Sequence, residues 1–574
     1  MPTLAPRFLT PCALLILAAC TDGPVAPPPV EVSCDSPTSV TLAPGEFKIV
    51  DPLAQGACVQ LPAAAAGGAE HLYVALAAAG RETSTGVSVG YTLAAAPPEA
   101  ATAAAAGTAH PSLSAAAADL PGARVFQAPT PADAFHARLR ERERLISESP
   151  GAAITATLGA PPVLIPPAPG SQRTFKICAT TDCVNFVNVT ATALHVGRKA
   201  AIYLDNTVPA GGYTQADIDS VGNLFDDYLY PIDTTAFGRE SDIDGNGVVA
   251  VLLTDQVNQL SASCNAAGSV ILGYFFGADL EPSQNGSNAG EVFYGLVPDP
   301  GNSSCTITKA YAKIHLAPTF IHEFQHMISY NQHVLVRGGL SEDVWLNEAL
   351  SHLAEQLGAM QIPDPLCTDD SGVHSCASQF LQSNIQNGYR YLRDVEATPL
   401  IETSQSTGAL AERGANWLFI RWLVDQFSSD PLGTAFTRQL DATSALGSAN
   451  VAQATGEPFP TLVTQWQLAN YLDHLPGFTP ASPRLQYRTI DLRATYAQLN
   501  QQLPATFPRV FPLVPDSTRT GTYRRTGTLR DGSGRHLRII QAPSAAAVNL
   551  QLTDSTGAAV GSTAVPRIGI VRIR

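Results

Sequence analysis

The sequence predicts a multidomain protein in which a central α+β domain, with a mixed sheet and paired helices, lies between small β-rich regions. The chain has 574 residues, which is too long for a single hydrophobic core. The helical pattern is strongest in Ile321–Glu355, whereas short strand-like runs separated by Gly, Pro and Ala dominate 32–93 and 506–574. Hydrophobic residues at 45% and charged residues at 14% indicate a globular rather than a disordered chain.

Changes in composition give the expected domain boundaries. The expected division is residues 1–19 as an export signal, 20–31 as a tether, 32–93 as a β-rich N-terminal domain, 94–170 as an Ala/Pro-rich linker with a short charged helix, 171–500 as the α+β domain and 506–574 as a separate β-rich C-terminal module. The stretch before residue 171 is either a propeptide or an uncleaved spacer, and the sequence leaves both open.

Alternation of apolar and polar residues and capping residues give the expected strands and helices. Strands are expected at Val40–Leu42, Phe47–Val50, His71–Leu76, Val87–Leu93, Lys199–Leu204, Val248–Leu253, Val270–Phe276, Val292–Val297, His536–Gln541 and Val548–Thr553. Helices are expected at Ala134–Ser147, Gln379–Leu392, Trp417–Phe427 and in a segment capped by Thr214.

The first residues have the pattern of an export signal. Arg7 precedes the apolar run Ala13–Ala19, which is too short to span a bilayer as a mature helix. Leu17–Cys20 resembles a bacterial lipobox, in which cleavage leaves Cys20 as a lipidated N-terminus. The alternative is an ordinary signal peptide with an incidental cysteine. Thr21 after the cysteine favours outer-membrane sorting, so we expect an exported, membrane-anchored lipoprotein, periplasmic or at the cell surface.

The cysteines fit an oxidising compartment. Of the ten, Cys12 falls in the signal and Cys20 at the anchor, which leaves an even number that can pair. Spacing does not fix the connectivity. Pairing each cysteine with its nearest neighbour gives Cys34–Cys58, Cys178–Cys183, Cys264–Cys305 and Cys367–Cys376.

The charge of the chain argues against general nucleic-acid binding. Asp and Glu number 49 against 34 Lys and Arg, for a net charge of −15. We therefore expect no nucleic-acid partner.

The motif that carries chemistry is His322-Glu323-Phe324-Gln325-His326. Histidines four residues apart lie on one face of a helix, so both imidazoles can reach one zinc ion. Glu323 can then act as the general base on a water at the metal. We expect this helix to begin with Pro318 in its first turn.

A third ligand is expected from the helix that follows. After a Gly-Gly turn, Ser341 can cap a helix that begins at Val344 and stops near Gly358. A helix, a turn and a returning helix would bring Glu348 beside the histidine pair. His352 and Glu355 lie on the same helical face, so periodicity alone does not exclude them.

The two motifs resemble the gluzincin metallopeptidases, in which an Asn-Glu pair on the second helix supplies the third zinc ligand. The motif sequence HEFQHMI…WLNEALSHLAE most resembles that of hyicolysin-type peptidases. The resemblance implies a zincin-like fold for the central domain, with zinc held by His322, His326 and Glu348. Thermolysin-like enzymes place an aspartate four residues after the third ligand, where this chain has His352. Ser351, His352 or Glu355 is expected to orient a zinc histidine instead.

The sequence does not match the metzincins, a second class of zinc peptidases with the same histidine pair. The metzincin pattern requires a Gly and a His at fixed positions after the second zinc histidine, and Ser329 and Gln332 stand there instead. The metzincin reading is therefore disfavoured.

A second metal is indicated by Asp242-Ile243-Asp244-Gly245-Asn246-Gly247. Alternating oxygen ligands at Asp242, Asp244 and Asn246 before a glycine turn suit calcium. The loop is not an EF-hand, because its twelfth position is Leu253 rather than Glu. The alternative is an Asx-rich turn that leads into the next strand.

These features predict a secreted, lipid-anchored zinc endopeptidase that acts on polypeptides, and a strand at the edge of its sheet could pair with the substrate backbone. The rival hypothesis is a surface adhesion or binding lipoprotein with an inactive peptidase domain. The intact motif argues against that rival, because an inactive domain has no need of Glu323. Hydrolysis of a non-peptide bond also remains open.

Overall fold

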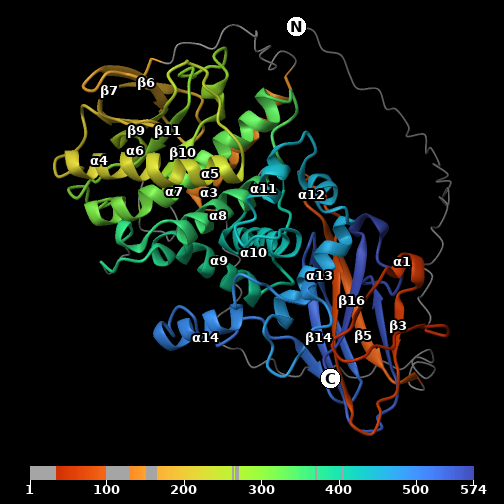
Figure 1. Ribbon diagram of the computed structural model, residues 1–574. Coiled ribbons are helices and arrows are strands. Elements are labelled where there is room, and N and C mark those ends of the chain that lie inside the picture. Colours follow the sequence, from red (N-terminus) through yellow and green to blue (C-terminus); the bar gives the residue numbers. More distant parts are fainter. Residues whose placement is uncertain are drawn as a thin grey trace, which may run out of the picture.

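The computed structural model describes residues 34–83, 85–98, 130–149, 165–261, 264, 270–368, 372–403 and 406–574. Figure 1 shows a helix-rich half that contains one sheet, and a β-sandwich built from the red and blue ends of the colour scale. The expected signal, the tether and Cys20 lie outside the described residues. Among the residues that are described, no helix is both long enough and apolar enough to cross a membrane.

A six-stranded sheet forms one side of the helix-rich half. Its strands follow the order β10-β11-β9-β8-β7-β6. The bounds are β6 Gln172–Cys178, β7 Phe186–Val196, β8 Ala200–Asp205, β9 Val249–Leu253, β10 Gly273–Phe275 and β11 Val292–Gly295. β8, β9 and β11 run parallel, whereas β10, β7 and β6 pair antiparallel with their neighbours. The sheet is therefore mixed, and β10 is one of its edges.

Helices pack on this sheet and on one another. Their bounds are α4 Gln215–Leu224, α5 Tyr230–Ala236, α6 Asp255–Gln259, α7 Lys309–Tyr330, α8 Val344–Gln361, α9 Gln382–Arg393, α10 Leu410–Phe427, α11 Thr434–Asp441, α12 Gly447–Thr455, α13 Phe459–Leu472 and α14 Leu492–Gln502. Thr214 caps α4, as predicted, in a reciprocal capping box with Asp217. Phe320 of α7 stacks on Phe293 of β11 with ring centroids 4.7 Å apart, so α7 is fixed against the sheet.

The expected start of the first motif helix is wrong. Pro318 was expected in the first turn, but α7 begins at Lys309 and Pro318 lies in its interior. A proline there has no N–H for the carbonyl of Ile314. The side-chain amide of Gln379 donates to that carbonyl at 2.8 Å instead, and this long-range hydrogen bond lets the helix continue through the proline.

The expected cap of the second motif helix is also wrong. α8 begins at Val344 with Asp343 at the N-cap position, and no side chain at that position accepts a cap hydrogen bond. The carboxylate of Glu82, far upstream, accepts from the N–H of Val344 at 2.8 Å. A carboxylate at a helix N-terminus is favourable, so the cap comes from tertiary contact rather than from Ser341.

The two β-rich regions are not separate modules. One sheet has the order β1-β3-β15-β5-β13 and the other β12-β14-β4-β16-β2. The bounds are β1 Thr38–Ser39, β2 Phe47–Val50, β3 Cys58–Leu61, β4 Ala69–Ala77, β5 Ser88–Ala96, β12 Asp516–Thr518, β13 Tyr523–Arg530, β14 Gly534–Gln541, β15 Val548–Thr553 and β16 Pro566–Arg572, with the short helix α1 Pro52–Gln55 between β2 and β3. β4 and β5 each lie between two C-terminal strands, because pairing across the chain satisfies both of their hydrogen-bonding edges. The expected strand Val40–Leu42 is not formed, and β1 ends just before it.

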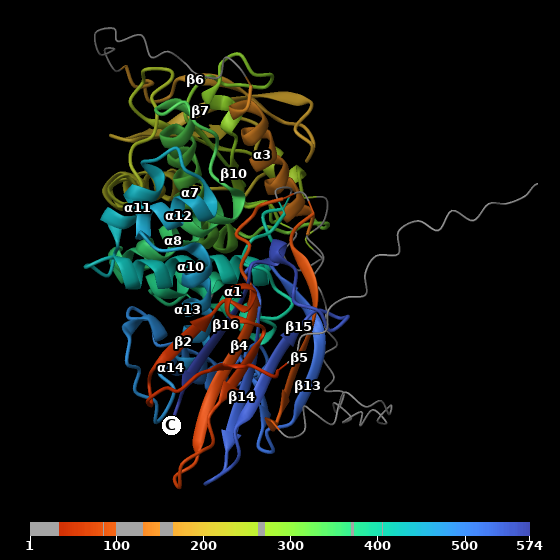
Figure 2. The same ribbon diagram turned by 90° about the vertical axis from the view of Figure 1, so that its right-hand side faces the viewer.

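The sandwich packs on the helix-rich half through β4. All but the first residue of this strand are buried. Tyr73 and Ala75 belong to the core between the two sheets, whereas Leu72, Val74 and Leu76 belong to the core that includes α13. A strand buried on both faces reads as a continuous apolar run. Figure 2 shows the strands stacked directly against the helices around α13.

The charged helix expected in the linker packs in the core of the helix-rich half. α3, Pro131–Ser147, is capped by Thr130 and Asp133. Phe135, Leu139 and Ile146 are buried with residues of the six-stranded sheet. Residues 131–147 are therefore part of this half of the molecule and not a spacer, and Figure 2 shows α3 beside β10.

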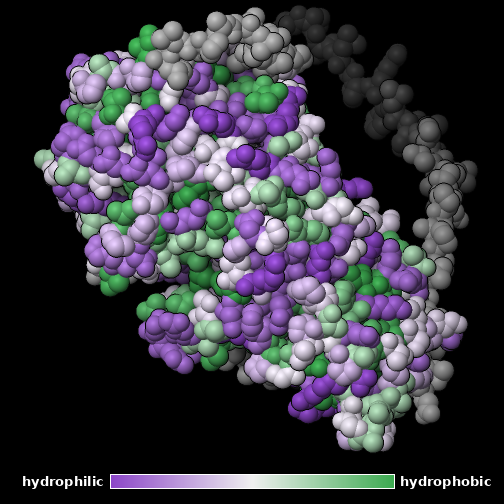
Figure 3. Space-filling model, in the orientation of Figure 1, coloured by the Kyte–Doolittle hydropathy of each residue, from purple (hydrophilic) through white to green (hydrophobic). Residues whose placement is uncertain are grey.

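Four disulfides confirm the nearest-neighbour pairing. They join Cys34–Cys58, Cys178–Cys183, Cys264–Cys305 and Cys367–Cys376. On the face drawn in Figure 3, hydrophobic residues are scattered among hydrophilic ones. That distribution is ordinary for a folded protein surface.

Candidate metal centre

The two motif histidines are held by hydrogen bonds that fix their tautomers. His322 and His326, both on α7, have ring centroids 4.9 Å apart. Nδ1 of His322 lies 2.7 Å from Glu355 Oε1, and Nδ1 of His326 lies 3.0 Å from Asn347 Oδ1. Because both of these partners are acceptors, each Nδ1 carries the proton. Each Nε2 lies on the far side of its ring from that partner, and it is the atom at which a metal could take the place of a proton.

Glu348 lies on the Nε2 side of both rings. Its Oε2 is 3.5 Å from His322 Nε2 and its Oε1 is 3.6 Å from His326 Nε2. Two ligands of a tetrahedral zinc ion, each about 2.0–2.2 Å from the metal, are roughly 3.4 Å apart. The Glu348 carboxylate thus lies at the spacing of a zinc ligand from both Nε2 atoms, and Glu323 also has an oxygen within 4.8 Å of a nitrogen of each histidine.

The other two candidate ligands, His352 and Glu355, lie on the Nδ1 side of His322. Glu355 contacts Nδ1 of His322, on the side of the ring away from Glu348, and it also lies 3.1 Å from Nδ1 of His352. Ser351 donates to Gln325 at 2.6 Å and lies 3.1 Å from Nδ1 of His326. His322, His352 and Glu355 are also close enough to share a metal ion, and Glu355 contacts His322 at Nδ1, the nitrogen that carries the proton.

Glu323 faces the cavity beside the histidines. Its Oε2 accepts from the N–H of Phe275 in the edge strand at 2.9 Å, and its Oε1 lies 3.7 Å from Nδ1 of His136. The side chain is only 2% exposed. Burial raises the pKa of Glu323, against the opposing charge of His322. A raised pKa suits a carboxylate that must both take and return a proton.

The site carries surplus negative charge. Burial alone would lower the pKa of His322, but the carboxylates of Glu348 and Glu355 outweigh it and raise that pKa to about 10. Burial would likewise raise the pKa of Glu348, yet the two histidines hold it well below its usual range. The surroundings therefore favour a cation at this position.

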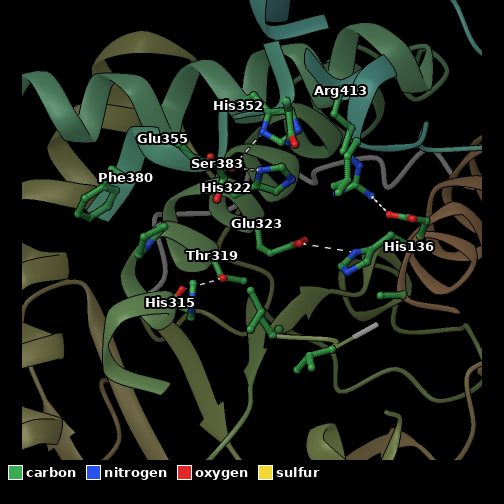
Figure 4. A pocket seen from close by; sticks show the side chains of 18 of the residues that line it. His136, His315, Thr319, His322, Glu323, His352, Glu355, Phe380, Ser383 and Arg413 are labelled. Carbon is green, nitrogen blue, oxygen red and sulfur yellow. Dashed lines mark hydrogen bonds and ion pairs between the residues drawn. The ribbon is translucent and has the colours of Figure 1, made fainter. Parts of the chain in front are cut away.

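A cavity of about 490 Å³ opens next to these residues, and its walls include His322, Glu323 and Glu348. Figure 4 shows Glu323 pointing across it towards His136, with Arg413 above. His136 comes from α3 and Arg413 from α10. The guanidinium of Arg413 pairs with Asp133 of α3 at 2.9 Å. Burial and the nearby Arg413 lower the pKa of His136 to about 3, so this imidazole is neutral at pH 7.

Sequence reasoning missed both of these pocket residues. They lie far from the motif in the chain, and no spacing rule connects them to it. One signal was present, because Phe135, Leu139 and Ile146 repeat at helical spacing and mark a buried face of α3. Two side chains of the C-terminal half that could also donate to an oxyanion, Tyr391 and His374, have their partners elsewhere. Tyr391 bonds to Gln467, and His374 bonds to a backbone carbonyl.

The acidic loop before β9 is folded by its own side chains. The N–H of Gly247 donates to Asp242, and the N–H of Val248 donates to Asn246 Oδ1 at 2.7 Å. The amide of Asn246 donates to Asp244 at 2.7 Å. Asp242 and Asp244 come together with Glu291, a residue that the sequence reasoning did not connect with them, whereas the oxygen of Asn246 is engaged within the loop.

The chain is similar to a known metalloprotease. It is 32% identical over 150 residues to the neutral metalloprotease ShpI of Staphylococcus hyicus, which is 25% of this chain and 31% of that protein. The chain thus spans about a third of the length of this curated relative. This similarity supports the resemblance to hyicolysin-type zinc metallopeptidases.

Two further comparisons add little. No family model matches the chain. A solved M1 zinc metallopeptidase from Deinococcus radiodurans is 14% identical, covering 52% of this chain and 48% of that chain, with a TM-score of 0.21. A likeness of that size carries no argument about this fold.

Proposed function

We propose that the chain is a zinc endopeptidase in which His322, His326 and Glu348 hold the metal. The observation that carries this is the convergence of both Nε2 atoms and the Glu348 carboxylate at 3.5–3.6 Å. The similarity to a neutral metalloprotease supports it independently. Glu355 and Asn347 would fix the two imidazoles, which is the usual role of groups hydrogen-bonded to zinc histidines.

Glu323 is the proposed general base. Zinc bound at this site would supply a Lewis acid that polarises the scissile carbonyl and acidifies water. Glu323 takes a proton from the attacking water and later gives it to the amine nitrogen of the leaving group. The N–H of Phe275 fixes its other carboxylate oxygen, so the side chain needs no rearrangement to do this.

His136 and Arg413 are proposed to bind the carbonyl oxygen as negative charge develops on it. Both line the cavity, and each can donate a hydrogen bond. A neutral imidazole donates through one nitrogen without adding a full charge beside the zinc site. Burial alone would lower the pKa of Arg413, but the charges of Glu348 and Asp133 outweigh it and raise that pKa, so the side chain stays charged.

The edge strand β10 is proposed to bind the substrate backbone. The N–H of Phe275 is bound to Glu323 and its carbonyl accepts from Arg140, so both groups point away from the sheet. Gly273 lies two residues before and therefore presents its polar groups to the same side. Because Gly273 lines the cavity, an extended polypeptide could pair with it there.

The test uses the full chain, since α3 belongs to the catalytic half. Casein cleavage should require zinc, stop on chelation and return when zinc is added. Glu323→Gln should abolish cleavage while keeping about one zinc per chain, because a general base is not a ligand. The rival, a binding lipoprotein with an inactive domain, predicts no chelator-sensitive cleavage by the parent chain.

Anchoring through Cys20 rests on the sequence motif alone, and export fits the four disulfides. Cys20→Ser should move the protein from the membrane fraction to the soluble fraction. A mature N-terminus that mass spectrometry maps to another residue would contradict the anchor.

A further inference from the structure

We propose that Asp242, Asp244 and Glu291 hold a calcium ion at the amino-terminal ends of β9 and β11. This site is separate from the candidate zinc site, and none of the three residues lines the 490 Å³ cavity. The sequence pattern indicated Asp242 and Asp244. The structure adds Glu291, which lies 44 residues beyond the end of the Asp242–Gly247 loop and directly precedes β11.

The geometry suits a hard divalent cation. One oxygen from each of the three carboxylates lies within 4.8 Å of the others. Oxygens bound to a calcium ion at about 2.3–2.6 Å can be at most roughly 4.6–5.2 Å apart, so one ion can reach all three. The donor set contains only oxygen, which favours calcium over zinc, and water would complete the coordination.

A second observation points to a missing partner at Glu291. This residue is 3% exposed. Its Oε1 accepts hydrogen bonds from Ser241 Oγ and from the N–H of Ile243. Its Oε2 is buried and has no hydrogen-bond partner among the described residues. A buried carboxylate oxygen without a partner is costly, and a cation beside two further carboxylates would relieve that cost.

The opposing contact is Arg173. Its guanidinium lies 3.4 Å from Asp244 Oδ2 and also donates to the carbonyl of Asn288. One positive charge does not neutralise three carboxylates, so negative charge remains for a divalent ion to offset. Gly290 permits this crowding, because a Cβ there would lie 2.7 Å from Asp244 Oδ2.

The ion would connect two parallel strands. Asp242 and Asp244 precede β9, Glu291 precedes β11, and these strands pair directly, with Ala250 opposite Val292. β11 in turn pairs with the edge strand β10. Calcium would therefore stabilise the sheet whose edge forms one wall of the candidate active site, without contact with the zinc ligands.

The experiment is a thermal unfolding series on the zinc-loaded full chain with calcium, with magnesium and with neither. With free calcium about 100-fold above its Kd, the midpoint should rise by about 5 °C, and one calcium should bind per chain by titration calorimetry. Magnesium should have a smaller effect, because it demands stricter geometry and gives up water reluctantly. No calcium-dependent shift and no binding at millimolar calcium would overturn the proposal.

Glu291→Gln keeps the hydrogen-bond acceptor but removes the charge, so the calcium-dependent shift should disappear while zinc content stays unchanged. If this variant does not fold, Asp244→Asn should give the same loss. Asp182→Asn is the matched control, since Asp182 closes a turn of the same sheet through Thr180 and Val184, and it should retain the full shift. A full calcium response in Glu291→Gln would show that the ion binds elsewhere. None of these readouts depends on peptidase activity.

Discussion

At the scale of single residues, the third zinc ligand is the sharpest test. Glu348→Gln should lower zinc affinity severely, because it removes the anionic ligand from the Nε2 side of both histidines. Glu355→Gln and His352→Ala should cost about 10–100-fold, because they act through the orientation of His322. Competition with a chromogenic chelator measures all three.

The opposite ranking would identify a different centre. If Glu355→Gln releases zinc while Glu348→Gln retains it, the metal is held by His322, His352 and Glu355. His326→Ala separates the two arrangements further, since it should abolish zinc binding only when Glu348 is the third ligand.

At the scale of elements, α3 contributes His136 to the cavity from outside the motif. His136→Ala should lower kcat/KM by about 10²–10³-fold, the range expected when one oxyanion donor is lost, with zinc content unchanged. His374→Ala is the control, because His374 bonds to the carbonyl of Cys367, away from the cavity. Steady-state kinetics on a peptide substrate and metal analysis provide the two readouts.

An unchanged kcat/KM in His136→Ala would mean that Arg413 alone binds the carbonyl oxygen of the substrate. A simultaneous loss of zinc would instead mean that α3 supports the metal site structurally.

The contact between α11 and α7 predicts a pH dependence of stability. Asp441 at the end of α11 is fully buried beside Ser329 and Gln325, and burial raises its pKa to about 8. Its folded pKa is above the unfolded value, so its contribution to stability is complete below about pH 4 and is lost as the pH rises through about 8. Asp441→Asn stays neutral throughout and should therefore gain stability relative to the parent between pH 5 and pH 9.

Other groups near Asp441 also titrate, so the measured quantity is the difference in the free energy of unfolding between the parent and Asp441→Asn. Burial also raises the pKa of Glu342 and Asp233, whereas it lowers the pKa of His333 to about 4. These groups are present in both proteins. Denaturant unfolding of the pair across pH 5–9 measures the difference, and a constant difference would contradict the assignment to Asp441.

At the scale of the whole molecule, both chain ends form one sandwich. A chain truncated after residue 505 should fail to fold in its N-terminal region, because β4 and β5 would each lose both neighbouring strands. Without β14 and β16, β4 would no longer hold Leu72, Val74 and Leu76 in the core that includes α13. Expression in soluble form and limited proteolysis measure this, and a protease-resistant fragment that contains 34–98 would restore the two-module model.

Local patterns allowed the sequence to predict individual elements in both the sandwich and the helix-rich half. Strands β2 and β15 were placed with the observed bounds, and Thr214 was identified as a cap, because alternation and capping chemistry act over a few residues. Spacing did not fix the disulfide connectivity, but the nearest-neighbour pairing is the one that the structure has. The start of α7 was predicted wrongly at Pro318, because local sequence does not show that the distant Gln379 binds the carbonyl that a proline inside the helix leaves free.

The sequence by itself determined the motif chemistry: two histidines at i and i+4, a glutamate beside them, and an Asn-Glu pair on a second helix. Its periodicity of 3.6 residues put Glu348, His352 and Glu355 on one face and could not rank them. Only the tertiary structure decided that Glu348 meets the Nε2 atoms while Glu355 meets Nδ1, because the crossing of α7 and α8 sets which side of each ring a carboxylate reaches. The placement of α3 at the cavity and the joining of the chain ends were decided in the same way, since long-range burial and strand pairing depend on partners that no local pattern contains.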